Sequence, residues 1–380
     1  MTRRERLNAA LRGEPVDRPP VCFYELDGIN QDPDNDDPFN VFHDPSWRPL
    51  LDLTREKADC IHLSGPPFRN WPPNPLEDLT TSQEWMDESG SRRFKTTLKA
   101  GTRLLTSQTR CDPEVYTIWT TEHLLKDVDD FKAWLELPEQ GPPSDPDVGP
   151  FLEREKRMGD RGIVALDTGD PICSVAPLFD LGTFTVIAMT EPELFHRALE
   201  RAARVIQPRI EEVARALPGR LWRIYGPEYA SPPYLPPRLF DEYIVRYDKP
   251  MIDAIQKHGG IARIHSHGRL KGILGLIAAT GCKGLDPVEP PPQGDVTLAQ
   301  VRKALGQDVV LFGNIEVSDI ENLPTDQFAE KVRTALREGP NEAGRAFVLM
   351  PSASPYGRTI TPLTLRNYET MVELAESFAP

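Results

Sequence analysis

The run Ile261-Ala262-Arg263-Ile264-His265-Ser266-His267-Gly268 reads as a buried strand that ends in two histidines. Two similar runs follow, Gly284-Leu285-Asp286-Pro287-Val288-Glu289 and Val309-Val310-Leu311-Phe312-Gly313-Asn314-Ile315-Glu316, and each ends in acidic or amide groups. Polar groups at successive strand ends are typical of the active site of a (β/α)8 barrel. The stretch therefore predicts a parallel α/β fold whose site lies at the carboxyl ends of the strands.

Strand-like and helix-like segments alternate outward from this stretch, which favours a parallel sheet covered by helices. Strands are expected at residues 21–26, 58–63, 162–166, 221–225, 261–265, 284–288, 309–312 and 347–350. Helices are expected at residues 192–217, 237–258, 270–280, 298–305, 325–338 and 362–378. We predict one domain over residues 1–380, a single (β/α)8 TIM barrel. A doubly wound sheet is the alternative, but no Gly-rich phosphate loop follows the first strand.

Two additions to the barrel are expected. Residues 3–11 have helical periodicity and are followed by Gly13, which predicts an N-terminal helix. Polar and apolar residues alternate over residues 92–121, which predicts a β-hairpin excursion instead of another strand–helix unit. A short helix is expected at residues 127–135.

Composition excludes several classes of function. The net charge of −14 disfavours non-specific binding to nucleic acid or to an anionic membrane. No apolar run is long enough for a transmembrane helix, and the charged N-terminus lacks the apolar core of a signal peptide, so we expect a cytoplasmic enzyme. The five cysteines are odd in number and widely spaced, which disfavours a disulfide framework.

His265 and His267 are the first candidates for chemistry. Residues i and i+2 of a strand share a face, so both rings can point into the mouth of the barrel. There they are candidates for catalysis and for binding one metal ion, with Glu228 as a further ligand. The alternative is a hydrogen-bond network in which one imidazole is a general acid or base.

Other candidates follow other strands. Glu289 is a candidate base or ligand. The residues expected to bind substrate are Asp286, Asn314, Glu316, Tyr356 and Arg358. Asp167 and Asp170 follow the strand at residues 162–166, and either can line the pocket.

Some conspicuous residues are read as structural. Arg18 is expected to pair with a carboxylate at the amino end of the barrel, away from the chemistry. Cys282 opens a strand at that same end and is expected in the core. Trp71, Trp119 and Tyr234 are candidate walls for an aromatic or apolar substrate, although isolated aromatic residues are usually packing.

The N-terminal segment resembles a known family. Arg4-Glu5-Arg6-Leu7, followed by Ala10-Leu11-Arg12-Gly13-Glu14-Pro15-Val16-Asp17-Arg18-Pro19-Pro20-Val21, is similar to the N-terminal signature of the uroporphyrinogen decarboxylase superfamily. The His-x-His-Gly, Gly-Leu-Asp and Phe-Gly-Asn-Ile-Glu segments agree with its layout, as does the final Leu349-Met350-Pro351-Ser352. The resemblance covers nearly the whole chain and implies a single (β/α)8 barrel.

The decarboxylases of this superfamily bind substrate carboxylates with arginines placed just after the first strand. This chain has Glu25 and Asp27 there, which would repel a porphyrinogen, and it has no histidine near the last strand. These departures from the decarboxylase branch disfavour tetrapyrrole decarboxylation.

The cobalamin-dependent methyltransferases form the other branch, and they bind zinc through a His-x-Cys pair and a later Cys. His265 matches the first ligand, His267 stands in place of the Cys, and Ser352 or Ser354 stands near the later Cys. This departure implies a nitrogen and oxygen site, completed by Glu228 or Glu289, which still suits Zn²⁺.

The first functional hypothesis is a zinc-assisted methyltransferase or demethylase that passes a methyl group between a small substrate and a corrinoid on a partner protein. The second is a metal-free decarboxylase acting on another carboxylated substrate, with a histidine as proton donor and Arg358 as carboxylate anchor. The third is a non-catalytic protein that binds a corrinoid or tetrapyrrole. Superfamily members often pair, so a homodimer stands beside a monomer as an expectation.

Overall fold

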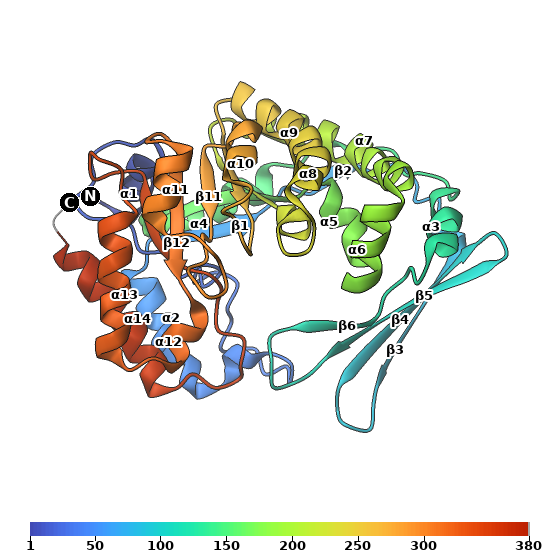
Figure 1. Cartoon of the computed structure of the whole chain (residues 1–380). Helices are drawn as coiled ribbons and strands as arrows, with labels where there is room; N and C mark the ends of the chain where they lie inside the picture. The colour runs from blue at the N-terminus through green and yellow to red at the C-terminus, as the bar shows by residue number, and fades with distance from the viewer. Residues whose placement is uncertain (379–380) are drawn as a thin grey trace.

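The computed structural model describes residues 1–378, and its centre is a curled, parallel, seven-stranded sheet (Figure 1). The strand order is β1-β8-β9-β10-β11-β12-β13. The strands are β1 (Cys60–Ser64), β8 (Gly162–Gly169), β9 (Leu221–Tyr225), β10 (Ile261–His265), β11 (Gly284–Asp286), β12 (Val310–Ile315) and β13 (Phe347–Pro351). The parallel α/β fold is confirmed.

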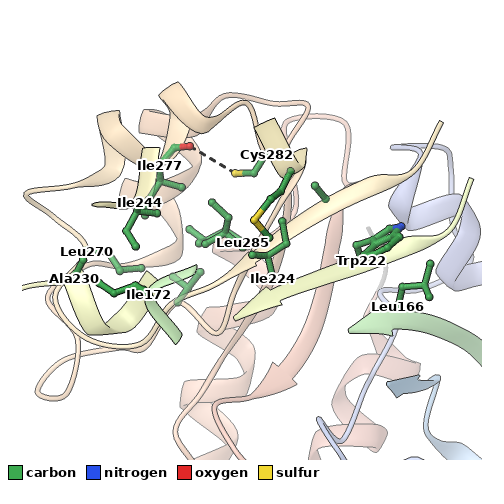
Figure 2. Close-up of a cluster of buried hydrophobic side chains, with 14 of the residues drawn as sticks. Leu166, Ile172, Trp222, Ile224, Ala230, Ile244, Leu270, Ile277, Cys282 and Leu285 are labelled. Carbon is green, nitrogen blue, oxygen red and sulfur yellow. Dashed lines mark hydrogen bonds between the residues drawn. The ribbon is translucent and has the colours of Figure 1, made fainter. Parts of the chain in front are cut away.

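Helices lie between successive strands and cover the outer face of the sheet. They are α4 (Gly149–Met158), α7 (Pro192–Ala216), α9 (Arg246–Lys257), α10 (Leu274–Thr280), α11 (Leu298–Leu305), α13 (Thr325–Glu338) and α14 (Pro362–Ser377). Trp222, Ile224 and Leu285 belong to the buried apolar layer between the strands and these helices, and Figure 2 shows Ile224 and Leu285 on the side of Ile244 and Ile277, with Trp222 farther along beside Leu166. Cys282 is buried in the same layer, where its Sγ contacts the carbonyl oxygen of Ile277 at 3.7 Å, as its core assignment predicts.

The predicted strand at residues 21–26 is wrong. This segment forms only isolated bridges, between Val21 and Leu349 and between Phe23 and Leu26. Pro20 has no N–H to donate, and Tyr24 has a φ of 54°, which turns the chain out of the extended conformation. The segment still lies between the two edges of the sheet, because Cys22 donates to Leu349 and Asp59, just before β1, donates to Val21. The structure therefore shows an open, curled sheet of seven parallel strands, a half-barrel, where a closed barrel of eight strands was expected.

An ionic cluster supports the amino end of the sheet. Helix α1 (Arg3–Leu11) carries Arg6, whose Nη1 donates to Asp59 Oδ1 at 2.7 Å. Arg18 Nη1 donates to Asp59 Oδ2 at 2.8 Å, and the same oxygen accepts from the backbone of Val21 at 2.8 Å. Asp59 is fully buried, so this carboxylate joins three segments of the chain. The structural role expected for Arg18 is confirmed.

The excursion is larger than the predicted hairpin. It is a four-stranded antiparallel sheet that extends away from the rest of the molecule (Figure 1). Its strands are β3 (Thr80–Met86), β4 (Arg92–Ala100), β5 (Arg103–Cys111) and β6 (Ile118–Glu122). Leu98, Ala100 and Leu105 are buried at its base, where they join the main core.

The remaining elements connect these layers. The helices are α2 (Arg48–Lys57), α3 (Val128–Leu135), α5 (Pro171–Val175), α6 (Leu181–Thr190), α8 (Pro237–Phe240) and α12 (Val317–Asn322). A π-helical turn (Asp241–Val245) joins α8 to α9 within the expected helix at residues 237–258. The short strands β2 (Phe68–Asn70) and β7 (Ser144–Pro146) pair with each other. Among the described residues no single helix is long and apolar enough to cross a membrane. One bent pair of helical segments, Pro171–Leu178 with Leu181–Thr190, has the length and apolar composition of a membrane span only when the two segments are taken together.

Candidate active site

The alternation of side chains along the strands brings charged groups together on the inner face of the sheet. Asp167 is in register with Arg223 on the next strand, and Arg223 is in register with Arg263 on the strand after that. One level further along, His265 is in register with Asp286. Residues at the same level on neighbouring parallel strands are adjacent in space, so these side chains form two stacked layers.

Arg223 is the centre of the first layer. Its guanidinium donates to both carboxylate oxygens of Asp167, at 2.8 and 3.0 Å, and Nη1 also donates to Glu25 and to the Tyr24 hydroxyl, each at 3.0 Å. Burial lowers the pKa of Arg223, but the hydrogen bonds to Asp167 and the surrounding negative charge outweigh burial and raise it. The arginine is thus held as a fully paired cation.

Asp286 connects the second layer to the first. It is fully buried, with Arg263 Nε at 3.1 Å from Oδ1 and His265 Nδ1 at 2.8 Å from Oδ2. Burial raises the pKa of Asp286, but the charges of Arg263 and His265 outweigh burial and lower it to about 2. The ionised carboxylate orients His265 by accepting from its Nδ1, and Arg263 also lies over the ring of Phe312, at 4.6 Å.

His267 forms a second pair of the same kind. Its Nδ1 donates to Glu289 Oε1 at 2.7 Å, and the other oxygen of Glu289 accepts from the backbone of Gly268 at 2.8 Å. Burial lowers the pKa of His267, but the hydrogen bond and charge of Glu289 outweigh burial and raise it. Conversely, burial raises the pKa of Glu289, but the hydrogen bond from His267 lowers it overall.

The rings of the two histidines lie close together. The ring centroids of His265 and His267 are 4.7 Å apart, and each Nδ1 is paired with a carboxylate while no described residue hydrogen-bonds to either Nε2. Carboxylate-bound imidazoles of this kind are typical metal ligands. Within residues 1–378, however, no three His, Cys, Asp or Glu side chains are grouped closely enough to hold an ion. The two histidines fit a metal, and the third ligand is not in place.

A cavity of about 670 Å³ opens beside His267. Glu228 and Glu289 line it together with His267, and four aromatic side chains form much of its wall, namely Phe179, Phe184, Tyr229 and Tyr234. An apolar cavity with a few convergent polar groups is typical of a small-molecule site. Tyr234 therefore forms part of the wall of this cavity, the position expected for a residue that contacts an aromatic or apolar substrate.

Glu228 and Glu316 lie close to the His267–Glu289 pair. Glu228 is positioned by its own loop, because its Oε2 accepts from the backbone of Gly226 at 3.0 Å. Burial and the charge of Glu289 raise the pKa of Glu316. The hydroxyl of Ser352 donates to Glu316 at 3.1 Å and accepts from the backbone of Val317 at 3.1 Å. Ser352 thus orients Glu316.

Three predicted substrate-binding residues lie elsewhere. Asn314 lines a different cavity, with α13 residues. Tyr356 and Arg358 lie in the loop after β13, where the backbone oxygen of Tyr356 accepts from Tyr116 at 2.6 Å. The guanidinium of Arg358 donates to the carbonyl oxygens of Pro113 and Pro38. These contacts attach the loop to the connection between β5 and β6 and to the segment around Pro38, and neither residue lines the cavity beside His267.

Sequence reasoning missed Arg223, Arg263 and Tyr24. A usable signal was present, because Leu221-Trp222-Arg223-Ile224-Tyr225 and Ile261-Ala262-Arg263-Ile264-His265 carry an arginine at the same position of two apolar strands. A buried arginine needs a paired anion, so two such strands predict carboxylates on their neighbours.

Comparisons with known proteins agree with this architecture. A solved structure of a methyltransferase from Methanosarcina mazei superposes with a TM-score of 0.60 over 98% of this chain and 98% of that chain, at 19% identity, which shows a shared fold. No curated protein matches the sequence. The model of the uroporphyrinogen decarboxylase (URO-D) family matches residues 174–378, which is more than half of the chain and includes both histidines and their carboxylate partners. The chain therefore belongs to the uroporphyrinogen decarboxylase family.

Proposed function

We propose that this protein is an enzyme that transfers a methyl group between a small substrate and a corrinoid carried by a partner protein. The observation that carries the proposal is the pair of imidazoles whose Nδ1 atoms are paired with Asp286 and Glu289, at 2.8 and 2.7 Å, beside an aromatic cavity. The family and the fold shared with a methyltransferase support it.

A divalent ion, Zn²⁺ first, would be held by His265 and His267, with Glu228 in place of a thiolate. Such an ion would polarise the oxygen or sulfur that carries the methyl group. Because Glu228 accepts only a backbone hydrogen bond, from Gly226 at 3.0 Å, its carboxylate can reorient at low cost.

The protein groups then have distinct roles. Asp286 and Glu289 keep both imidazoles oriented with Nε2 toward the reacting atoms. Tyr229, Tyr234 and the two phenylalanines bind the apolar body of the substrate and exclude water. Glu316, whose pKa is raised by burial, is positioned by Ser352 as a candidate proton donor close to the site. The corrinoid protein would dock over this cavity, and Val21–Phe23 would complete the sheet as a barrel.

The direct test is formation of methylcob(III)alamin from free cob(I)alamin. The purified protein would be incubated with methylated ethers, thiols and amines, and the corrinoid spectrum followed. Formation with at least one substrate, abolished by His267→Ala and preserved by His43→Ala, an exposed histidine outside this cavity, supports the proposal. Corrinoid methylation that is unchanged in His267→Ala contradicts it.

Metal-free decarboxylation is the second candidate. The raised pKa of His267 favours a protonated ring, which suits a general acid that protonates a carbanion after loss of CO2. The two proposals differ in product, since decarboxylation releases CO2 and leaves the corrinoid spectrum unchanged, whereas methyl transfer changes that spectrum.

A further inference from the structure

A second cavity lies at the carboxyl ends of β8 and β9. Its volume is about 430 Å³, and it lies between these strand ends and α7. The proline-rich segment from Gly65 to Trp71 covers it. None of its lining residues is shared with the cavity beside His267, so it is a separate site.

The cavity contains an arginine with no acidic partner. Arg209, on α7, donates from Nη2 to the hydroxyl of Thr168 at 2.9 Å, and no described carboxylate lies within 4.0 Å of its guanidinium. Two other arginines of α7 do have acidic partners, because Arg197 pairs with Glu136 and Arg204 pairs with Glu139. Burial lowers the pKa of Arg209. A partly buried cation without an anion is costly unless a ligand supplies one.

Aromatic rings surround this arginine. Phe68, Trp71, Trp222 and Tyr225 all line the cavity, and the rings of Phe68 and Trp71 pack edge to face with centroids 6.0 Å apart. Trp71 remains 53% exposed at the cavity, which is unusual for so large a ring. Trp222, beside Leu166 in Figure 2, is 3% exposed, and its Nε1 has no hydrogen-bond partner. The site therefore combines one free cation with flat apolar walls.

The acidic residue in the lining does not neutralise Arg209. Asp167 is bound through both of its oxygens by Arg223, at 2.8 and 3.0 Å. Its charge is therefore balanced on the inner face of the sheet. An incoming anion meets the charge of Arg209 with little net repulsion.

We propose that this cavity binds a small aromatic carboxylate. The carboxylate would accept two parallel hydrogen bonds from Arg209, and the ring would lie against Trp71 and Tyr225. A single guanidinium matches a monoanion better than a phosphate, because the lining holds no second cation and no other charged donor. The volume suits a ligand of this size. The inference does not rest on the proposed methyl transfer.

The test is calorimetric titration of the full chain with benzoate, with benzamide and acetate as probes that lack the charge or the ring. Saturable binding of benzoate is expected, with benzamide and acetate at least about tenfold weaker. Arg209→Gln should weaken benzoate at least about tenfold, whereas Arg209→Lys should retain part of the affinity. The matched control is Arg204→Gln on the same helix, whose arginine pairs with Glu139 at the surface, and it should leave the affinity unchanged.

Two further variants locate the bound probe. Trp71→Ala should weaken benzoate about threefold to tenfold and leave acetate unchanged. Tyr234→Ala, in the cavity beside His267, should not affect benzoate. The proposal is overturned if benzoate does not bind at millimolar concentration, if Arg209→Gln and wild type bind it equally, or if Tyr234→Ala rather than Arg209→Gln removes binding. Circular dichroism confirms that each variant is folded.

Discussion

The inner face of the sheet has an apolar amino half and a charged carboxyl half, built from the same strands. Leu221 lies two residues before Arg223 on β9, and Ile261 lies two residues before Arg263 on β10. The amino half packs apolar side chains, among them Leu7, Leu11, Ile61, Ala165 and Leu221. The carboxyl half holds ion pairs. One alternating pattern therefore supplies both the packing and the chemical groups.

The two halves are stabilised in different ways. Apolar burial in the amino half is favourable in itself and independent of pH. In the carboxyl half, Arg263 is 2% exposed and Asp286 is fully buried, so removal of either side chain would leave a buried charge without its partner. Substitutions in the two halves should therefore lower the free energy of unfolding with a different dependence on pH.

The largest effect is expected for Asp286→Asn. It leaves Arg263 without its carboxylate at 3.1 Å, which should lower the free energy of unfolding by about 3–5 kcal/mol. Urea denaturation measures the loss. Asp253→Asn, which removes an exposed pair with Lys249, is the control and should change stability by less than about 1 kcal/mol. Equal effects of the two substitutions would mean that the buried pair contributes no more to stability than an exposed pair.

Leu221→Ala tests the amino half on the same strand as Arg223. Leu221 is 3% exposed, and its truncation should cost about 2–4 kcal/mol through lost burial and a residual cavity. This loss should be the same at pH 7 and at mildly acidic pH in urea denaturation. A strong pH dependence would show that the apolar half is coupled to the ionic half.

Acid should remove the contribution of Asp286. Its pKa is lowered from 3.8 to about 2 in the folded protein, so its stabilisation is present above about pH 4 and is lost as pH falls through about 2. The size of the shift corresponds to about 2–3 kcal/mol. The stability difference between wild type and Asp286→Asn should shrink over this range. A constant difference would contradict the assigned ion pair.

The smallest effect is expected at His267, which is 35% exposed. Its raised pKa means that its stabilisation is complete below the unfolded pKa, about 6.5, and is lost as pH rises through the folded value. NMR titration of the metal-free protein should give a pKa above that of an exposed histidine. Glu289→Gln should lower the value, and an unchanged pKa in that variant would remove Glu289 as its cause.

Much of the fold could be predicted because its long elements are strongly periodic. The strands Leu221–Tyr225 and Ile261–His265 and the helices Leu298–Leu305 and Thr325–Glu338 have the predicted bounds. The strand predicted at residues 21–26 failed because proline chemistry and the turn at Tyr24 override its apolar pattern. β3 (Thr80–Met86) was missed because it is exposed on both faces and carries no alternation.

The site could be predicted where chemistry follows the end of a strand. His265, His267, Asp286 and Glu289 were expected there, and the structure pairs them. Tyr356 and Arg358 also follow a strand, but their loop attaches to the antiparallel sheet through contacts far apart in the sequence. Arg223 and Arg263 were missed because periodicity shows which residues face inward and not which charges find partners.

Elemental analysis decides whether the carboxyl half of the sheet is a metal-dependent reaction centre built on His265 and His267. The untagged wild-type protein and the His265→Ala/His267→Ala variant would be purified together, saturated with Zn²⁺ and freed of excess ion. About one equivalent of zinc is expected in the wild type, and its loss is expected in the variant. Equal zinc content in the two proteins, or none in either, would rule out a metal-dependent centre at these histidines.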